Sequence, residues 1–304
     1  MTRDESQYAS GRSHSRSLRG PWTRLVKILA IVLGVVLAVQ LACAVRNHLW
    51  TVALRNVCAA NLAGVGKAMR QYAGANMGSW PIAPHAPATQ PGVGRVTYAP
   101  GMIGKKREGV LPGVAPFDLT TTELSTTASL WMLVRTGNPT NTSFVCPTST
   151  DYYGSYDNVE QLWDFESHAY TSYGYQVPYG QAGWPREPGE PRMVLMADKG
   201  PYGAALEAGM PHPGAPTALV SSWARSWRPW NTVNHERMGQ NVLRADGSTA
   251  WSATPLAGVG QDNIYTRWSD PTGGSDADPT PRIHGTPPTG IEMPFADTDS
   301  LIYP

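Results

Sequence analysis

An apolar run near the N-terminus limits the fold of this chain more than any other feature. Residues 28–45 contain no charged side chain, and Gln40 is the only strongly polar residue among them. As a helix, a run of this length would extend about 27 Å, close to the hydrocarbon thickness of a bilayer. We therefore expect a single transmembrane helix at 28–45.

The residues before this run set its expected orientation. Residues 1–27 carry six Arg and Lys side chains against two acidic ones, and the positive-inside rule places such a segment in the cytoplasm. We expect a single-pass protein of the cell membrane, anchored in the lipid bilayer, with everything after Arg46 extracytoplasmic. A cleaved export signal is the alternative, because Ala42 and Ala44 form an A-x-A pattern around Cys43.

The helix is expected to continue beyond the membrane. Apolar residues recur there at spacings of three and four, which is typical of an amphipathic helix; they are Leu54, Cys58, Leu62, Val65, Met69 and Tyr72. Lys67 and Arg70 lie off this stripe. We predict one helix from about Arg24 to Ala75, in which 46–78 enters an extracytoplasmic domain and covers a sheet with its apolar stripe.

The remainder, 79–304, is predicted to be β-rich with long loops. The chain contains 31 glycines and 27 prolines, and their density after Pro81 excludes long helices there. A short helix is expected at 126–135, and strands are expected at 143–146, 171–177, 192–197 and, as a hairpin around Asp246-Gly247, within 241–252. The predicted fold class is α+β, a long N-terminal helix packed on an antiparallel sheet.

The motifs, taken in order, resemble a known family. They comprise Cys58, Asn61, Leu62, Gly66 and Tyr72 on the helix, then Cys146-Pro147, His235, Asn241, Asp246-Gly247 and Trp251. This series is similar to that of prepilin-like membrane proteins abundant in planctomycetes. The resemblance implies a pilin-like fold and a structural or assembly role in type II secretion or in type IV pilus-like filaments. It also implies other pilin-like or secretion-system subunits as partners.

Two positions depart from the family pattern. The prepilin signal normally has a glycine followed by Phe-Thr-Leu-Ile-Glu, whereas Gly20 here is followed by Pro21-Trp22-Thr23-Arg24-Leu25. The glutamate thought to pair with a neighbouring pilin subunit is therefore absent. The family's His and Asp-Gly are separated by nine residues, whereas ten residues separate His235 from Asp246.

We expect no catalytic site. His235, Asp246 and Ser248 are a candidate triad, but Ser248 stands in a hairpin turn without an oxyanion signature. The preferred interpretation is structural: His235 hydrogen-bonds backbone near the hairpin, and Asp246 supplies turn geometry. Val242, Leu243 and Trp251 are expected to press one face of the sheet onto the long helix.

The sequence offers a candidate calcium site but disfavours zinc and nucleic acid as ligands. Zinc is disfavoured because no C-x-x-C or H-E-x-x-H spacing occurs. A loop containing Asp270, Asp276 and Asp278 is a candidate calcium site, with an ordinary solvated acidic loop as the alternative. Nucleic acid is not an expected partner, because the net charge is only +1 and charged residues make up 15% of the chain.

Cysteine chemistry and function each leave two alternatives. Cys43 lies in the apolar run, so Cys58 and Cys146 form either a disulfide or two buried free thiols in an oxidising compartment. The protein is either a pilin-like structural or assembly subunit or an anchored binding module. The binding module would use its aromatic loops to hold a glycan or a peptide.

Overall fold

The computed structural model describes residues 21–83, 126–154, 159, 162, 164–165, 168–178, 189–203, 212–216, 223–270, 274–275, 277–288 and 294–304. The basic segment before Pro21, most of the predicted irregular stretch after Ala83, and Asp276 of the candidate calcium loop lie outside these residues.

The N-terminal helix α1, Pro21–Ala75, is continuous. Pro21 suits its first turn, because proline has the helical φ and lacks the amide hydrogen that would go unpaired there. At the other end, Met77 and Gly78 take positive φ of 54° and 78°. The Gly78 amide donates to the Ala73 carbonyl at 2.8 Å, which closes the helix end. The helix therefore ends at Ala75, as its sequence predicts.

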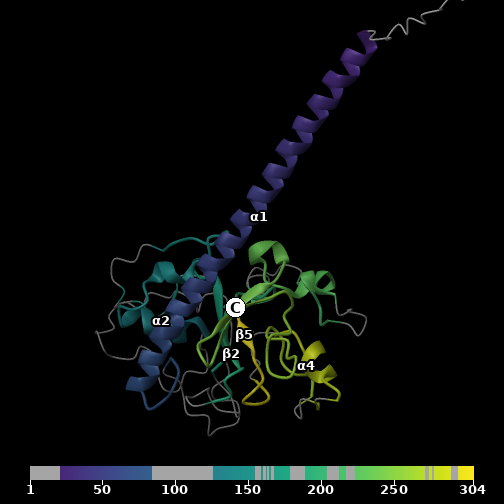
Figure 1. Cartoon of the computed structure of the whole chain (residues 1–304). Helices are drawn as coiled ribbons and strands as arrows, with labels where there is room; N and C mark the ends of the chain where they lie inside the picture. The colour runs from purple at the N-terminus through teal and green to yellow at the C-terminus, as the bar shows by residue number, and fades with distance from the viewer. Residues whose placement is uncertain are drawn as a thin grey trace, which may run out of the picture. The chain divides into compact units, whose positions relative to one another are not determined.

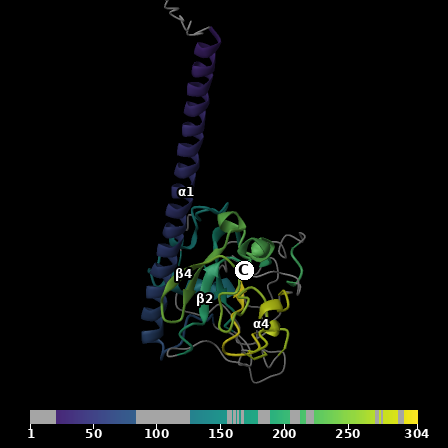
Figure 2. The same ribbon diagram turned by 45° about the vertical axis from the view of Figure 1, so that its right-hand side comes forward.

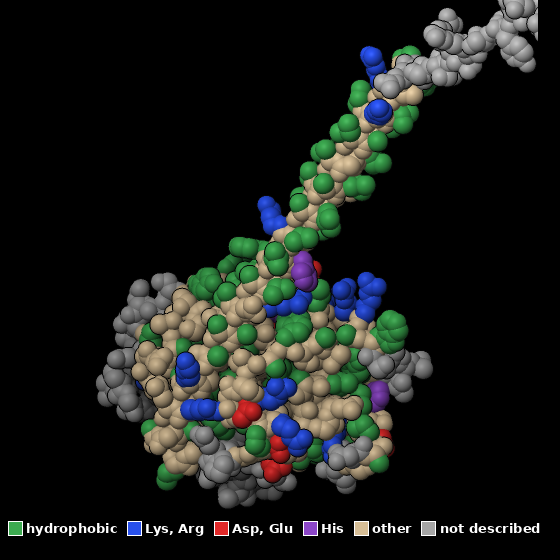
Figure 3. Space-filling view, in the orientation of Figure 1, with side chains coloured by type: hydrophobic (Ala, Val, Ile, Leu, Met, Phe, Trp, Pro, Cys, Tyr) green, Lys and Arg blue, Asp and Glu red, His purple; other side chains and the backbone are tan. Residues whose placement is uncertain are grey.

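The chain divides into two compact units, Met1–Trp50 and Thr51–Pro304. In the first unit, every described residue of α1 is exposed. Figure 3 shows apolar side chains along the visible face of this part of the helix, with basic side chains near its two ends. Within the described residues, one helix is long and apolar enough to cross a membrane, and it is α1. An apolar surface of this size is suited to lipid rather than water.

The second unit contains a five-stranded antiparallel sheet with strand order β4-β3-β2-β1-β5. The strands are β1 Tyr173–Gln176, β2 Val194–Asp198, β3 Gln240–Arg244, β4 Thr249–Ser252 and β5 Ile302–Tyr303. The described helices of this unit, besides the end of α1, are α2 Thr126–Arg135, η1 Asn141–Phe144, η3 His168–Tyr170, η4 Ala224–Trp230, η5 Asn234–Arg237 and α4 Thr280–His284. The α+β class is thus confirmed.

Two elements differ from the sequence prediction. The expected strand at 143–146 begins as the 3-10 helix η1, and its end bonds to the chain just before β1. The Ser172 amide donates to Phe144 O at 2.8 Å, and the Cys146 amide donates to Ser172 Oγ at 2.8 Å. The C-terminal strand β5 was not predicted; it is two residues long and pairs with β1 at the edge of the sheet.

The end of α1 packs on one face of the sheet, as Figures 1 and 2 show. Its fully buried side chains are Cys58, Leu62, Val65, Met69 and Ala73, which share one core with α2 and with side chains of β1, β2 and β3. Lys67 and Arg70 are exposed, as expected for residues off the apolar stripe. At Gly66, a Cβ atom would lie 2.9 Å from Leu243 Cδ1, so glycine lets the helix approach β3 closely.

The opposite face of the sheet is covered by C-terminal segments, which lie across the sheet from α1 in Figure 2. Val242 belongs to this second core with Ile264, Tyr265 and Ile302. The expectation that Val242 and Leu243 press together on the long helix is therefore wrong. Neighbouring strand residues point to opposite faces of a sheet, so only Leu243 faces α1.

Two buried carboxyl groups lie in these C-terminal segments. Asp262 accepts hydrogen bonds from Trp268 Nε1 and from the Ser300 amide, each at 2.8 Å. Burial raises the pKa of Asp299 to about 7, although hydrogen bonds and the charge of Arg267 oppose the shift. Burial and the neighbouring Asp299 also raise the pKa of Asp262. The two carboxyl groups together therefore hold at least one proton at pH values at which exposed carboxyl groups have lost theirs.

This pair predicts a stability that falls with rising pH. Asp299 in the unfolded chain loses its proton near pH 4, whereas the folded protein keeps that proton up to about pH 7. Between these values the folded state binds more protons, so raising the pH should lower the free energy of unfolding by a few kcal/mol. Asp299→Asn should weaken this dependence and leave the part due to Asp262, in thermal melts of the detergent-solubilised chain followed by circular dichroism.

Asp246→Asn is the matched control, because Asp246 is an exposed carboxylate in a turn. This variant should keep the decline seen in the wild type. An unchanged pH dependence in Asp299→Asn would show that Asp299 is not a source of the decline in stability.

Candidate functional site

His235 occupies an unusual backbone conformation. Three consecutive residues of η5 have positive φ: 51° at His235, 57° at Glu236 and 58° at Arg237. This region costs a residue with a side chain roughly 1 kcal/mol or more. Asn234 anchors the segment by donating from Nδ2 to the Ser172 carbonyl at 3.1 Å. As a result the imidazole is buried, and such strained positions are often functional.

The imidazole lies in a buried group of four side chains that we call the His235 cluster: Cys58, Cys146, Asp198 and His235. They come from α1, the segment after η1, the end of β2, and η5. Each offers one metal-ligating atom, and these atoms all lie within 4.8 Å of one another. None of the four residues is more than 2% exposed. The fold thus brings together four polar side chains that are widely separated in the sequence.

Cys58 and Cys146 form a disulfide, with their Cα atoms 5.3 Å apart and a sequence separation of 88. Of the two alternatives that the sequence leaves open, the structure has the bridge. It connects α1 to the segment that leads toward β1. Cys43 is a free cysteine, exposed on the apolar part of α1.

His235 contacts side chains through both ring nitrogens. Its Nε2 lies 3.3 Å from Asp198 Oδ2 and 3.6 Å from Cys146 Sγ. Its Nδ1 lies 3.0 Å from Thr148 Oγ1. The Asn241 amide donates to Asp198 Oδ2 at 2.6 Å and orients that carboxylate. The expectation of backbone partners for His235 is therefore replaced by a side-chain network.

Trp251 and Arg55 pack beside the cluster. The Trp251 ring meets His235 edge to face, with centroids 5.3 Å apart. The Arg55 guanidinium lies 4.1 Å from the centroid of Trp251, a cation–π contact. Asn241 Nδ2 donates to the Arg55 carbonyl at 3.4 Å. These contacts connect α1 to the β3–β4 hairpin next to the cluster.

The remaining motif residues on α1 are placed to pack the helix against the domain and to fix its position there. Asn61 donates from Nδ2 to the Val145 carbonyl at 3.2 Å, one turn along α1 from the disulfide. Leu62 is fully buried, and Gly66 contacts β3. Tyr72 is half-buried near the end of the helix, whereas Pro147 is exposed in the turn after Cys146.

Asp246 and Gly247 form the β3–β4 turn, away from the His235 cluster. Asp246 Oδ1 accepts from the Ser248 amide at 2.8 Å, and hydrogen bonds from the side chain and the backbone of Ser248 lower the pKa of Asp246. Gly247 has φ of 79°, and a Cβ there would clash with the Arg70 side chain. The carboxylate beside His235 is Asp198, which the sequence analysis missed. Its one local signal is an acidic residue directly after the apolar strand at 192–197.

The candidate calcium loop is only partly described. Asp270 and Asp278 are exposed. Asp278 Oδ1 accepts from the Thr280 amide at 3.1 Å, at the start of α4, and hydrogen bonds from the side chain and the backbone of Thr280 lower the pKa of Asp278. Asp276 lies outside the described residues. Hydrogen bonding of Asp278 to the adjacent backbone is typical of a loop next to a helix start, and calcium binding stays a prediction.

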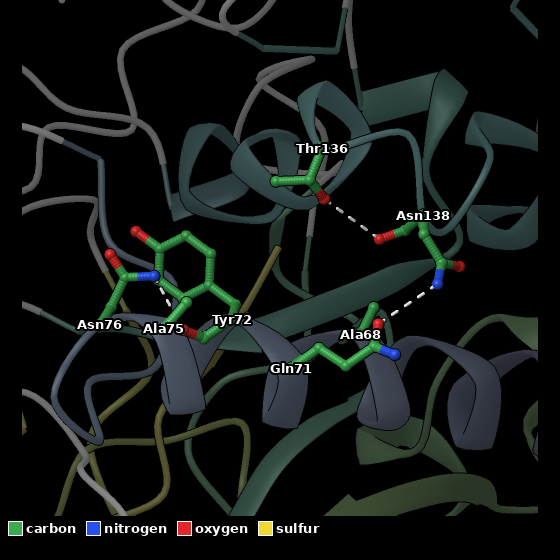
Figure 4. A pocket seen from close by; sticks show the side chains of 7 residues that line it. All are labelled: Ala68, Gln71, Tyr72, Ala75, Asn76, Thr136 and Asn138. Atoms are coloured by element: carbon green, nitrogen blue, oxygen red, sulfur yellow. Dashed lines mark hydrogen bonds between the residues drawn. The ribbon is translucent and has the colours of Figure 1, made fainter.

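A shallow pocket of about 270 Å³ lies between the ends of α1 and α2. Figure 4 shows its lining by Ala68, Gln71, Tyr72, Ala75, Asn76, Thr136 and Asn138. Asn138 donates to Gln71 Oε1 at 3.3 Å, and Asn76 donates to the Tyr72 carbonyl at 2.7 Å. The pocket thus offers amide groups and one aromatic ring, and none of its lining residues is charged.

The disulfide should contribute strongly to stability. Replacing both Cys58 and Cys146 by alanine should lower the free energy of unfolding by about 2 to 5 kcal/mol, because the bridge closes a long loop. The measurement is denaturant unfolding of the full chain in detergent, together with peptide mass spectrometry under nonreducing conditions.

Cys43→Ser is the control and should leave stability unchanged. Recovery of Cys58 and Cys146 as alkylated thiols from protein never exposed to reductant would show that the bridge is absent.

Searches against protein-family models, curated proteins and solved structures find no match to this chain.

Proposed function

We propose that the protein is a membrane-anchored structural or assembly subunit of pilin-like architecture. One observation carries the proposal: α1 is continuous from an exposed apolar part into the core of a sheet domain. The same helix would thus supply both the membrane anchor and part of the core of the domain. This arrangement suits a subunit that packs through its helix and presents its domain at the surface.

The anchoring of the domain supports this role. The disulfide joins α1 to the chain before the sheet, and Arg55 and Asn61 contact the domain on either side of it. Several residues of the motif series that resembles prepilin-like proteins make these contacts, namely Cys58, Asn61, Cys146 and Trp251. A role in a secretion or surface filament-like system follows from that resemblance.

Association within the bilayer would use the helix itself. The glutamate of the prepilin signal is absent, so the proposed packing does not depend on that charge. Small residues recur every four positions at Ala30, Gly34, Ala38 and Ala42, and such spacing favours close contact between membrane helices. Gly34 has no other atoms within 4 Å of its Cβ position, so this face of the helix is open.

The orientation has a direct test. With Cys43→Ser as background, Ser6→Cys should resist a membrane-impermeant maleimide in intact cells and react after permeabilisation. Trp223→Cys, at a site that is 76% exposed in the wild type, should react in intact cells. Efficient labelling at Ser6→Cys in intact cells would reverse the proposed topology.

Helix association can be tested by crosslinking. In the Cys43→Ser background, Ala42→Cys should give disulfide-linked dimers in oxidised membranes, and Gly34→Ile should reduce their yield several-fold by separating the helices. Val36→Ile lies on the opposite side of the helix and should keep the yield. Equal yields in the two variants would remove this face as the contact.

A second candidate function is binding of a glycan or a peptide. Among the described residues of the second unit, three aromatic side chains are largely exposed: Tyr152 at 65%, Tyr153 at 60% and Trp223 at 76%. Exposed aromatic rings favour stacking contacts with ligands. Capture of secretion or pilin-like subunits by the tagged full chain would favour assembly, whereas selective signals on a glycan array would favour binding.

A further inference from the structure

We propose that the His235 cluster is a zinc site when its disulfide is reduced. Cys58 and Cys146 would supply two thiolates, His235 would supply Nε2, and Asp198 would supply one carboxylate oxygen. The disulfide and the zinc site would be alternative states of the same four side chains. This inference is independent of how the protein assembles.

The spacing of the ligand atoms suits a tetrahedral ion. Zinc bonds are about 2.0–2.2 Å to nitrogen or oxygen and about 2.3 Å to sulfur, which gives tetrahedron edges of about 3.3 to 3.6 Å for the mixed pairs. His235 Nε2 lies 3.3 Å from Asp198 Oδ2 and 3.6 Å from Cys146 Sγ. Two edges of the tetrahedron are therefore already present.

Neighbouring groups hold two of the ligands in the required orientation. Thr148 Oγ1 pairs with Nδ1 of His235, which leaves Nε2 facing the cluster. The backbone amide of Asn241 donates a hydrogen bond to Asp198 Oδ2. Metal-bound histidines and carboxylates are commonly fixed by outer hydrogen bonds of this kind. Burial of all four ligands also excludes competing water.

The change between the two states balances chemically. A dithiol reductant gives two electrons and two protons to the disulfide, which yields two thiols and an oxidised dithiol. Zinc then replaces the two thiol protons, which are released to solvent. A tetrahedral site places the sulfurs about 3.8 Å apart, farther than any disulfide allows. The protein therefore cannot hold the bridge and the ion together.

The experiment uses the full chain in detergent with Cys43→Ser as background. The protein is reduced, freed of reductant without oxygen, and titrated with Co²⁺ as a spectroscopic substitute for Zn²⁺. We expect one ion per chain, with sulfur-to-cobalt charge-transfer absorption and the intense visible bands of a tetrahedral site. Zn²⁺ should displace the cobalt and abolish these bands, and the oxidised protein should show no such bands.

Variants identify the ligands. His235→Gln and Asp198→Asn should each weaken Zn²⁺ binding at least tenfold, measured by competition with a chelating dye, while circular dichroism reports whether each variant stays folded. His212→Gln, an exposed histidine outside the cluster, should bind as the background protein does. The proposal is overturned if the reduced background protein gives no thiolate bands. It is also overturned if folded His235→Gln and Asp198→Asn keep full affinity.

Discussion

The covalent link between Cys58 and Cys146 fixes where α1 meets the sheet domain. Apolar burial holds the stripe of α1 against the sheet, but it is not directional and does not by itself fix the helix at one position. The disulfide removes that freedom at one position. Two contacts farther along the helix are consistent with the same position of α1. They are the hydrogen bond from Asn61 to the Val145 carbonyl and the close approach of Gly66 to Leu243.

The motif residues make structural sense as one assembly. Cys58, Cys146 and His235 meet in the cluster, and Asn241 and Trp251 contact its members. Asp246 and Gly247 shape the turn at the far end of the same hairpin. The series that carries the family resemblance therefore describes how the helix, the η5 segment and the hairpin are held together. Strained backbone at His235 is consistent with a side chain whose placement matters more than local stability.

The sequence predicts the parts of this fold that local patterns determine. The apolar run and the apolar stripe predict α1, although the helix begins at Pro21 and not near Arg24, and Asp246-Gly247 predicts the hairpin. The strand β5 is not predicted because pairing with the distant strand β1 decides it. The 3-10 helix η1 is held by local bonds from Ser143 to Thr140 and from Val145 to Thr142, which the apolar β-rich pattern does not reveal. Because side chains alternate between the two faces along a strand, the sequence is enough to place Val242 and Leu243 on opposite faces of the sheet. Asp198 could not be paired with His235 from spacing, since 36 residues of chain separate them.

Both proposed states of the His235 cluster keep α1 in register, but they do so through different elements. The disulfide joins Cys58 to the segment before β1 alone, whereas a bound ion would also tie the helix to η5 and to the end of β2. Reduced protein without an ion would instead bury two thiols beside an imidazole and a carboxylate with less to hold them together. The arrangement therefore favours a cluster that is either oxidised or metal-bound, and it links the chemistry of four side chains to the place where the end of α1 packs on the sheet.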